Sequence, residues 1–257
     1  MMRENFLNRK RSSGKCEGIV IKLGTVSITT PDNGINKEII QKIAKSCSYL
    51  VDIGKRVSIV SSGAIACGKG KVKDYYSEQD ERLASIGQPI LMQAYIEAFS
   101  NYNRNVGQIL LTDADFDSRK RLELLRKTFK SLQDNNEIPI INENDAIATD
   151  EITFWDNDLL AANLTVDLKQ DLLLILTVYD GLMDKNRDIA ETGYSLKQEN
   201  YADLSSEIVR KGSGGLESKL NAAKICRDNC KICRIGNVNR DIIGILEGKE
   251  ISTTFYY

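Results

Sequence analysis

The chain has 257 residues, of which 42% are hydrophobic, so it can bury the core of one large α/β domain or two small ones. Its 35 basic and 36 acidic residues give a net charge of -1, which argues against a surface for nucleic acid or for an anionic membrane. No apolar run approaches the roughly 20 residues of a membrane-spanning helix, and residues 1–15 lack the apolar centre of a secretory signal. We therefore expect a cytoplasmic protein with a disordered tail at residues 1–15, or alternatively an organellar transit peptide there, and one domain at residues 16–257.

Short apolar runs typical of buried strands alternate along the chain with segments of helical spacing. The expected strands are 18–24, 57–60, 106–111, 138–141, 172–177 and 232–235, with a final extended segment ending near Phe255. The expected helices are 36–51, with Asn36 as N-cap, 86–99, 117–134, 158–167 and 216–227. This alternation predicts an α/β fold, a three-layer αβα sandwich with a mostly parallel central sheet. Residues 185–211 are polar and weakly patterned, and we expect them to be mobile.

Polar side chains gather within residues 140–164. The motif NEND at 142–145 follows an expected strand, and the carboxyl end of a parallel strand is the usual place for ligands in an open α/β sheet. The motif DND at 156–158 directly precedes an expected helix, so one of its residues is expected to cap that helix. Either cluster alone is explained as turn formers and caps. Two clusters in one short span predict a hairpin that joins them into a polar pocket for amino and carboxylate groups.

Two glycine-containing segments are candidates for phosphate binding. Residues 63–70, GAIACGKG, approach the P-loop pattern but end on Gly70, which has no hydroxyl group for a magnesium ion. The small residues 61–64 can still present backbone N–H groups to an anion. Residues 212–215, GSGG, make a better cradle, because glycines allow close approach, the following helix supplies donors and Lys219 adds a charge. On composition alone, a flexible linker before the helix explains these glycines equally well.

Cys226, Cys230 and Cys233 have the C-x3-C-x2-C spacing with which radical-SAM enzymes hold an iron-sulfur cluster. Cys226 continues a helical pattern and Cys233 enters the next apolar run, so we expect buried thiols that act as small hydrophobic side chains. The chain has no histidine and no fourth cysteine near these three, which leaves a zinc site poorly supported. We therefore expect no resident metal site.

In their order and spacing these motifs resemble the amino acid kinase family, and within it the glutamate 5-kinases, from about residue 18 to residue 255. The matching stretches are IVIKLGT, VSIVSSGAIACG, ASIGQ with LMQAY, QILLTDADF, IPIINENDAIAT, DNDLLAANL, LLLILT followed by DGL, and GSGGLESKLNAA. NEND followed by DND is the most diagnostic part. The resemblance implies an amino acid kinase domain at residues 16–257. It also implies ATP-dependent phosphorylation of the side-chain carboxylate of L-glutamate to L-glutamyl 5-phosphate, the first step of proline biosynthesis.

That chemistry agrees with the composition of the chain. A glutamate side chain has a pKa of about 4.3, so at neutral pH the nucleophile is already an anion and needs no general base. The absence of histidine is therefore no obstacle. The demand is instead for positioning and for cations on the transferring phosphoryl group.

The resemblance also implies roles for individual residues. Lys22 and Lys219 would contact the phosphates and stabilise the transition state, and Asp158 would orient both lysines. The implied glutamate-binding residues are Ser62, Gly63, Ala64, Asn144, Asp145 and Asn157. The implied ATP-binding residues are Lys22, Gly24, Thr177, Val178, Ser213, Gly214, Gly215, Leu216 and Lys219. The implied cofactors are ATP and Mg2+, with the metal ion arriving on the nucleotide.

The chain departs from the family pattern at three places. Trp155 stands where the family usually has glycine before DND, and could crowd or cover the pocket. Val178 stands where the family usually has aspartate, which removes a polar contact near ATP. The phosphate loop reads GSGGLESK where GTGGMxTK is common, and it keeps the glycines and the lysine. These changes bear on affinity and substrate range rather than on the fold.

The implied partners are L-glutamate, ATP, proline as a feedback inhibitor, and further copies of the chain in a dimer or tetramer. Nucleic acid and membrane are not expected partners. Many bacterial relatives carry a small C-terminal RNA-binding-like domain, which we expect this single-domain form to lack. Two alternatives stay open: a kinase of the same fold for N-acetylglutamate, aspartate or a nucleoside monophosphate, and a catalytically silent relative that binds ligand and regulates partners.

Overall fold

The computed structural model describes residues 10–11, 14–15, 17–73, 80–147, 156–193, 200–201 and 215–257. Within the expected tail, the described part is a pair of short antiparallel strands, β1 (Lys10–Arg11) and β2 (Gly14–Lys15). Much of the polar segment 185–211 lies outside the described residues. Residues 148–155, which include Trp155 and the middle of the expected hairpin, also lie outside them. The domain bounds therefore stay predictions.

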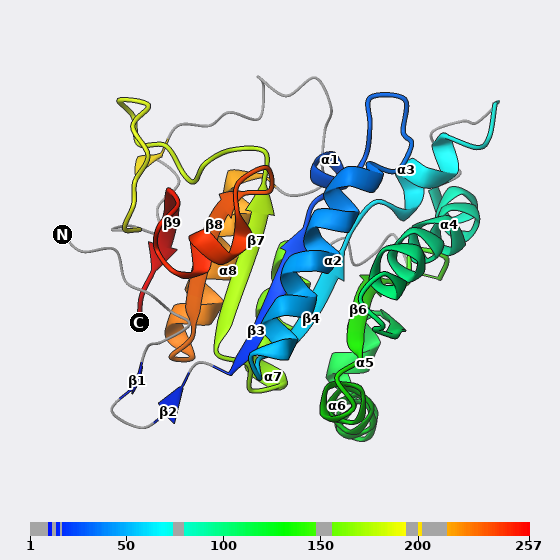
Figure 1. Cartoon of the computed structure of the whole chain (residues 1–257), viewed down its shortest axis with the longest axis horizontal. Helices are drawn as coiled ribbons and strands as arrows, with labels where there is room; N and C mark the ends of the chain where they lie inside the picture. Colours follow the sequence, from blue (N-terminus) through cyan, green and yellow to red (C-terminus); the bar gives the residue numbers. More distant parts are fainter. Residues whose placement is uncertain are drawn as a thin grey trace.

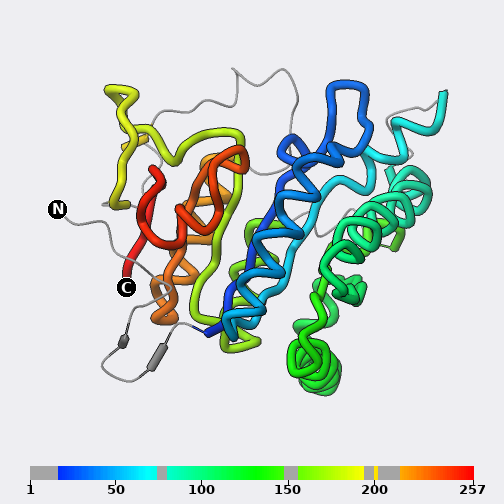
Figure 2. The backbone as a smooth tube through the Cα atoms, viewed as in Figure 1, coloured from blue at the N-terminus to red at the C-terminus, as the bar shows by residue number. Residues whose placement is uncertain are grey.

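Seven strands of the described chain form one sheet in the order β5-β6-β4-β3-β7-β8-β9 (Figure 1). Along the chain they are β3 (Gly18–Leu23), β4 (Arg56–Ser61), β5 (Val106–Leu111), β6 (Ile138–Glu143), β7 (Leu172–Thr177), β8 (Ile232–Asn237) and β9 (Ser252–Phe255). All neighbouring pairs are parallel except β8 and β9. Figure 2 shows the green middle of the chain at one edge and the red C-terminal part at the other. The predicted mostly parallel sheet is confirmed.

Helices cover both faces of the sheet, so the predicted three-layer arrangement is confirmed (Figure 1). On one face lie α2 (Lys37–Asp52), α4 (Asp80–Ser100) and α9 (Ile242–Leu246), and on the other lie α6 (Arg119–Asp134), α7 (Asn157–Asp167) and α8 (Leu216–Asp228). The short helices α1 (Thr25–Ile28), α3 (Ala64–Lys69) and α5 (Asp113–Asp117) follow the ends of β3, β4 and β5. No helix of the described ranges is long and apolar enough to cross a membrane.

Alternation along β3 decides which way its one cation points. Ile19 and Ile21 pack in the core on the α2 and α4 side, whereas Val20 packs on the α7 and α8 side. Successive side chains of a strand point to opposite faces, so Lys22 shares the face of Val20. Burial of each aliphatic side chain in these two layers stabilises the fold by roughly 1.5–3 kcal/mol. The core therefore holds Lys22 towards α7 and α8.

Most of the predicted elements match the structure to within a few residues, with two informative differences. Helix α4 begins at Asp80 rather than near residue 86, so Pro89 lies inside the helix and not in its first turn. Leu83 and Ala84 are buried and extend the apolar face of α4 toward its start. Helix α9 was not predicted, because a helix of five residues is too short to show a period. Its N-cap Asp241 accepts hydrogen bonds from two backbone N–H groups.

Two glycines allow α3 and α4 to approach the end of β4. Gly63 has φ of 105°, a left-handed conformation that side chains rarely adopt. A Cβ atom on Gly87 would lie 1.8 Å from the Ala64 carbonyl oxygen, so only glycine permits this contact between α4 and α3. This close packing brings Gln88 and Tyr95 of α4 to the sheet edge at which β4 and β6 end.

Candidate active site

The predicted site residues of the described chain lie at the edge where the parallel strands have their carboxyl ends. The chain runs from β3 to β4 in one direction along the sheet, and later from β7 to β8 in the other. The ends of the adjacent strands β3 and β7 therefore form a topological switch point, the usual ligand crevice of open α/β sheets. The sequence prediction of a polar pocket at this edge agrees with that topology.

Asp158 joins the two predicted lysines. Its Oδ1 atom lies 2.5 Å from Lys22 Nζ, and its Oδ2 atom lies 3.1 Å from Lys219 Nζ. The Asp158 side chain is fully buried, whereas 4% of the Lys22 side chain and 15% of the Lys219 side chain are exposed. Three elements far apart in sequence, β3, α7 and α8, thus place two ammonium groups around one carboxylate.

The charge balance of this cluster favours an ionised Asp158. Burial alone would raise the pKa of Asp158, but the nearby Lys22 and Lys219 ammonium groups outweigh burial and lower it. Asp158 also lies in the first turn of α7, where the helix dipole favours negative charge. Asp156 caps α7 by accepting from the Asp158 N–H at 2.9 Å, which confirms that one residue of DND is the N-cap. The pKa of Asp156 is raised, first by burial and then by the Asp158 charge.

A buried network of amides connects NEND to DND. Asn157 Nδ2 donates to Ser62 Oγ at 2.7 Å and to Asn142 Oδ1 at 3.1 Å. Asn142 Oδ1 also accepts from the Glu143 N–H, and Asn142 Nδ2 donates to Gln88 Oε1 at 2.9 Å. The two polar clusters are therefore in contact, as the sequence predicted, although the segment between them lies outside the described residues.

The amide network leaves one acceptor available. Both Nδ2 hydrogens of Asn157 are used within the network, so its Oδ1 atom faces away from those partners. This oxygen is buried and has no hydrogen-bond partner among the described residues. A buried carbonyl oxygen without a partner is costly, which points to a ligand that donates a hydrogen bond there.

Two carboxyl groups beside the network have raised pKa values. Burial, followed by the charges of Asp145, Asp113 and Asp156, raises the pKa of Glu143 to about 7. Burial, followed by the charge of Asp80, raises the pKa of Asp145 to about 6. Groups with such pKa values change charge close to neutral pH, as functional carboxyl groups often do.

The remaining predicted glutamate-binding residues line the same strand ends. Gly63 and Ala64 begin α3 directly after Ser62, whose N–H donates to the Leu23 carbonyl at 3.0 Å. The Asn144 N–H donates to the Leu111 carbonyl at 2.8 Å, which ties NEND to β5. Backbone hydrogen bonds thus tie Ser62 to the end of β3 and Asn144 to the end of β5.

The predicted nucleotide residues border the other side of Lys22. A Cβ atom on Gly24 would lie 3.8 Å from Lys22 Nζ, so Gly24 borders the ammonium group. Thr177 Oγ1 accepts from the Tyr179 N–H at 2.8 Å, and the loop after β7 begins with Val178. Gly215 is the N-cap of α8 and Leu216 is its first residue. Ser213 and Gly214 lie outside the described residues.

Sequence reasoning did not assign three residues that support this site: Asn142, Gln88 and Tyr95. The Tyr95 hydroxyl is 2.8 Å from Ser61 Oγ, and both groups are buried. Gln88 is a buried polar residue on an otherwise apolar face of α4. A polar residue at an apolar position of the helical pattern was the signal in the sequence that could have identified it. Asn142 stood in the recognised NEND motif, but its pairing with Asn157 depends on the fold.

The prediction for the three clustered cysteines was partly wrong. Cys226 and Cys233 are buried in the core, as expected. Cys230 is exposed, because it lies in the turn after α8 with a φ angle of 56°. Among the described residues, no group of three or more His, Cys, Asp or Glu side chains is arranged to hold a metal ion.

Known proteins share sequence and fold with this chain. Residues 17–237 match the model of the amino acid kinase family. A glutamate 5-kinase of Thermoanaerobacter sp. (strain X514) is 36% identical over 249 residues, which cover 92% of this chain and 67% of the relative. The glutamate 5-kinase of Alkaliphilus oremlandii is 35% identical, with 95% of this chain and 97% of the relative covered. The crystal structure of UMP kinase from Ureaplasma parvum shares the fold, with a TM-score of 0.62, 17% identity and coverage of 94% of this chain and 100% of that one.

Proposed function

The chain belongs to the amino acid kinase family, and we propose that it transfers the γ-phosphoryl group of ATP to the side-chain carboxylate of L-glutamate. The products are L-glutamyl 5-phosphate and ADP, and the reaction is the first step of proline biosynthesis. Relatives named glutamate 5-kinase that are 35% to 39% identical and cover most of the chain support this assignment.

The observation that carries the proposal is the pair of lysines held by one buried carboxylate. Phosphoryl transfer between two anions needs cations fixed in advance at the transferring group. Asp158 holds Lys22 and Lys219 at 2.5 and 3.1 Å, which fixes two ammonium groups close together at the strand ends. We assign phosphate contact to both lysines and their orientation to Asp158.

The amide network suits the amino-acid end of glutamate. An α-ammonium group donates hydrogen bonds, and Asn157 Oδ1 is a buried acceptor with no partner in the described chain. Asp145 supplies a carboxylate for the same ammonium group, while Ser62, Gly63, Ala64 and Asn144 line the pocket. The glutamate side chain would then extend toward Lys22, which follows from the adjacency of Asn157 and Asp158 in α7.

ATP would lie on the β7 and α8 side of Lys22. Gly24, Thr177, Val178, Gly215 and Leu216 border that region, and we assign the phosphate loop to residues 213–219 with Lys219. The described acidic residues do not form a resident metal cage, so we propose that Mg2+ arrives with the nucleotide phosphates. A cytoplasmic location, a dimer or tetramer, and inhibition by proline at the glutamate pocket also remain proposals.

The test is ADP release with MgATP and each of four acceptors: L-glutamate, aspartate, N-acetylglutamate and UMP. We expect turnover with L-glutamate alone. N-acetylglutamate and UMP lack the free ammonium group for which the pocket offers acceptors. Aspartate has that group, but its side chain is one methylene shorter, so its carboxylate would not extend as far toward Lys22. Turnover with another acceptor would replace the substrate assignment. Measurable binding of ATP and glutamate without turnover would instead favour a catalytically silent relative.

Glutamate use should weaken in acid because Asp145 must be ionised to bind the ammonium group. The pKa of Asp145 is raised to about 6, so below that value the carboxylate gains a proton in the free protein. We expect the KM for glutamate to rise by about tenfold per pH unit below this point. The measurement is kcat/KM for glutamate from about pH 5 to about pH 8.

Two variants identify the group that titrates. Asp145→Asn should remove the inflection and raise KM at neutral pH, whereas Glu143→Gln should keep an inflection near 6. A profile unchanged by Asp145→Asn would contradict the role of this carboxylate. In Asp145→Asn, stability should fall less than in the wild type as pH rises toward about 6, because the raised pKa of Asp145 makes ionisation of this carboxyl group unfavourable in the folded state. Glu143, with a pKa of about 7, keeps its own contribution of the same sign.

Removing the acceptor at Gln88 should weaken glutamate binding from a distance. Gln88→Leu leaves the buried Asn142 Nδ2 group without its partner, at a cost of about 1–3 kcal/mol. We expect a lower melting temperature and a KM for glutamate raised about tenfold, with the KM for ATP unchanged. Gln88→Glu keeps an acceptor oxygen at this position and serves as the matched control. Equal effects on both KM values would show that the network does not act on the glutamate side.

A further inference from the structure

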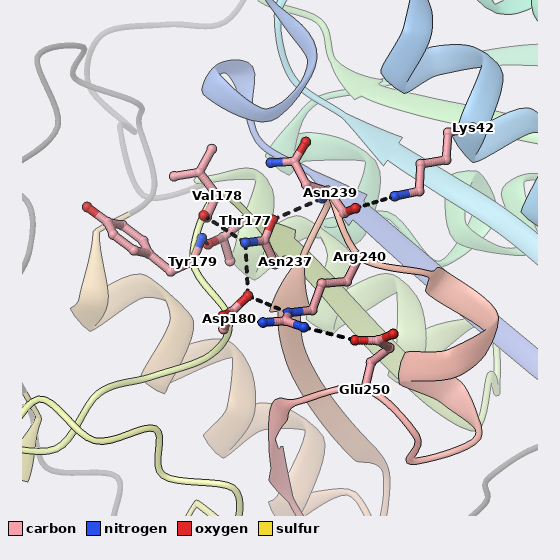
Figure 3. Close-up of polar contacts among 9 residues, drawn as sticks. All are labelled: Lys42, Thr177, Val178, Tyr179, Asp180, Asn237, Asn239, Arg240 and Glu250. Atoms are coloured by element: carbon pink, nitrogen blue, oxygen red, sulfur yellow. Dashed lines mark hydrogen bonds and ion pairs between the residues drawn. The ribbon is translucent and has the colours of Figure 1, made fainter.

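The loop that leaves β7 is tied to the loop that leaves β8 by side-chain hydrogen bonds (Figure 3). Asn237 Nδ2 donates to the Val178 carbonyl at 3.1 Å and to Asp180 Oδ1 at 3.0 Å. Asn237 Oδ1 accepts from the Asn239 N–H at 2.9 Å, so this amide uses both hydrogens and its oxygen. The backbone after Thr177 is therefore fixed by a residue of the neighbouring strand.

Arg240 makes the strongest of these contacts. Its Nε and Nη2 atoms lie 2.6 and 2.7 Å from the two carboxylate oxygens of Asp180, which is a bidentate pair (Figure 3). Its Nη1 atom donates to Glu250 Oε2 at 3.0 Å. The Arg240 hydrogen bonds lower the pKa of Asp180, which keeps the pair charged at neutral pH.

The chain beside Arg240 contacts the helix layer that contains α2 and α9. Lys42 of α2 donates to the Asn239 carbonyl at 2.6 Å (Figure 3). Asp241, the residue after Arg240, is the N-cap of α9. Glu250 lies between α9 and β9. The residues on either side of Arg240 are therefore held by α2 and by the start of α9. Asp180 belongs to the loop that follows Thr177 and Val178.

The far end of the same loop is fixed as well. The Leu182 N–H donates to Thr253 Oγ1 at 2.8 Å, and a Cβ atom on Gly181 would lie 2.6 Å from that oxygen. The segment between Val178 and Leu182 is consequently held on one side by β8 and on the other by β9. A loop held at both ends can present its backbone to a ligand in one conformation.

We propose that Arg240 is a positioning residue for the nucleotide, which acts by holding Asp180 and thereby the backbone of Val178. This inference rests on the proposed function, since ATP is placed beside Thr177 and Val178. Val178 has no side-chain charge with which to hold a nucleotide, so its contribution depends on where its backbone lies. The clamp of Arg240 and Asp180 supplies that placement from outside the pocket.

The experiment compares Arg240→Met with Arg126→Met. Arg126 forms an ion pair with Asp167 at 3.6 Å. The two ion pairs have similarly exposed side chains: 44% and 31% for Arg126 and Asp167, and 38% and 31% for Arg240 and Asp180. The control pair lies at the opposite end of α7 from Asp158. We expect Arg240→Met to raise both the KM for ATP and the calorimetric Kd for a non-hydrolysable ATP analogue by about fivefold, with the KM for glutamate unchanged. Arg126→Met should change none of these.

A lysine variant and a double variant test the mechanism. Arg240→Lys keeps the charge but not the bidentate fork, so most of the loss should remain. Asp180→Asn combined with Arg240→Met should be no worse than Arg240→Met alone, because both changes remove the same contact. An unchanged nucleotide Kd, or an equal rise in both KM values with a lower melting temperature, would overturn the inference. Failure of the wild-type protein to turn over glutamate would instead contradict the proposed function, because nucleotide binding is measured separately.

Discussion

Replacing Lys219 with alanine is expected to abolish glutamate-dependent turnover while the fold stays intact. The Lys219 ammonium group lies 3.1 Å from Asp158 Oδ2 in the first turns of α8, beside the region assigned to the phosphates. Its charge acts on negative charge that develops during transfer, so its loss lowers kcat rather than substrate binding alone. Removal of one such cation costs roughly 10³-fold or more in rate.

The measurement is single-turnover and steady-state ADP release, with circular dichroism to follow the fold. Lys224→Ala on the same helix is the matched control, because Lys224 is exposed and points away from Asp158 by helical spacing. The control should keep the wild-type rate. Near-normal kcat in Lys219→Ala would remove this lysine from the mechanism.

Asp158→Asn is expected to lower both kcat and stability, since it removes the carboxylate charge that pairs with Lys22 and Lys219. Lys22 is buried, and its other acidic neighbour, Asp156, lies 4.0 Å away and has a raised pKa. Breaking a buried ion pair from one side costs about 3–5 kcal/mol, and asparagine returns part of this by keeping an acceptor oxygen. We expect kcat to fall by about 10²-fold or more, because both lysines lose their orientation.

The pH dependence of stability shows whether Asp158 stabilises the fold through its negative charge or through the packing of its side chain. The pKa of Asp158 is lowered by its two lysines, so its contribution to stability is present above the unfolded value near 3.9 and is lost as pH falls through the folded value. Urea unfolding should show the largest difference between wild type and Asp158→Asn at neutral pH and a smaller one in acid. Asp167→Asn at the far end of α7 is the control. A difference that does not change with pH would contradict the ionised state of Asp158.

The local hydrophobic pattern of the sequence was sufficient to predict the strands and helices that form the layers of the fold. The runs at 18–24 and 172–177 are β-branched and leucine-rich, as fully buried parallel strands require, and both became central strands. The spacing of Ile39, Ile43 and Leu50 likewise identified α2, and Asn36 caps it by accepting from the Ile39 N–H. These signals depend on neighbours in sequence, so they can be recognised without the fold.

The contacts that complete the site depend on residues far apart in sequence. Gln88 and Asn142 are 54 positions apart, and Arg240 and Asp180 are 60 apart. Nothing in the local pattern of either pair predicts its partner, because the pairing arises only when α4 packs on α3 and β8 lies beside β7. The resemblance to a kinase family named the lysines and Asp158, but it did not name the residues that hold their neighbours in place.

The most direct test of the account is trapping of the acyl phosphate by hydroxylamine in the presence of MgATP and L-glutamate. A carboxylate nucleophile oriented toward Lys22 and Lys219 predicts glutamate-dependent hydroxamate, formed in proportion to ADP by the wild-type protein and lost in Lys219→Ala. Aspartate and N-acetylglutamate should give no hydroxamate above background. ADP formed from ATP and glutamate without any hydroxamate would contradict transfer to the side-chain carboxylate, and with it the assignment of this site.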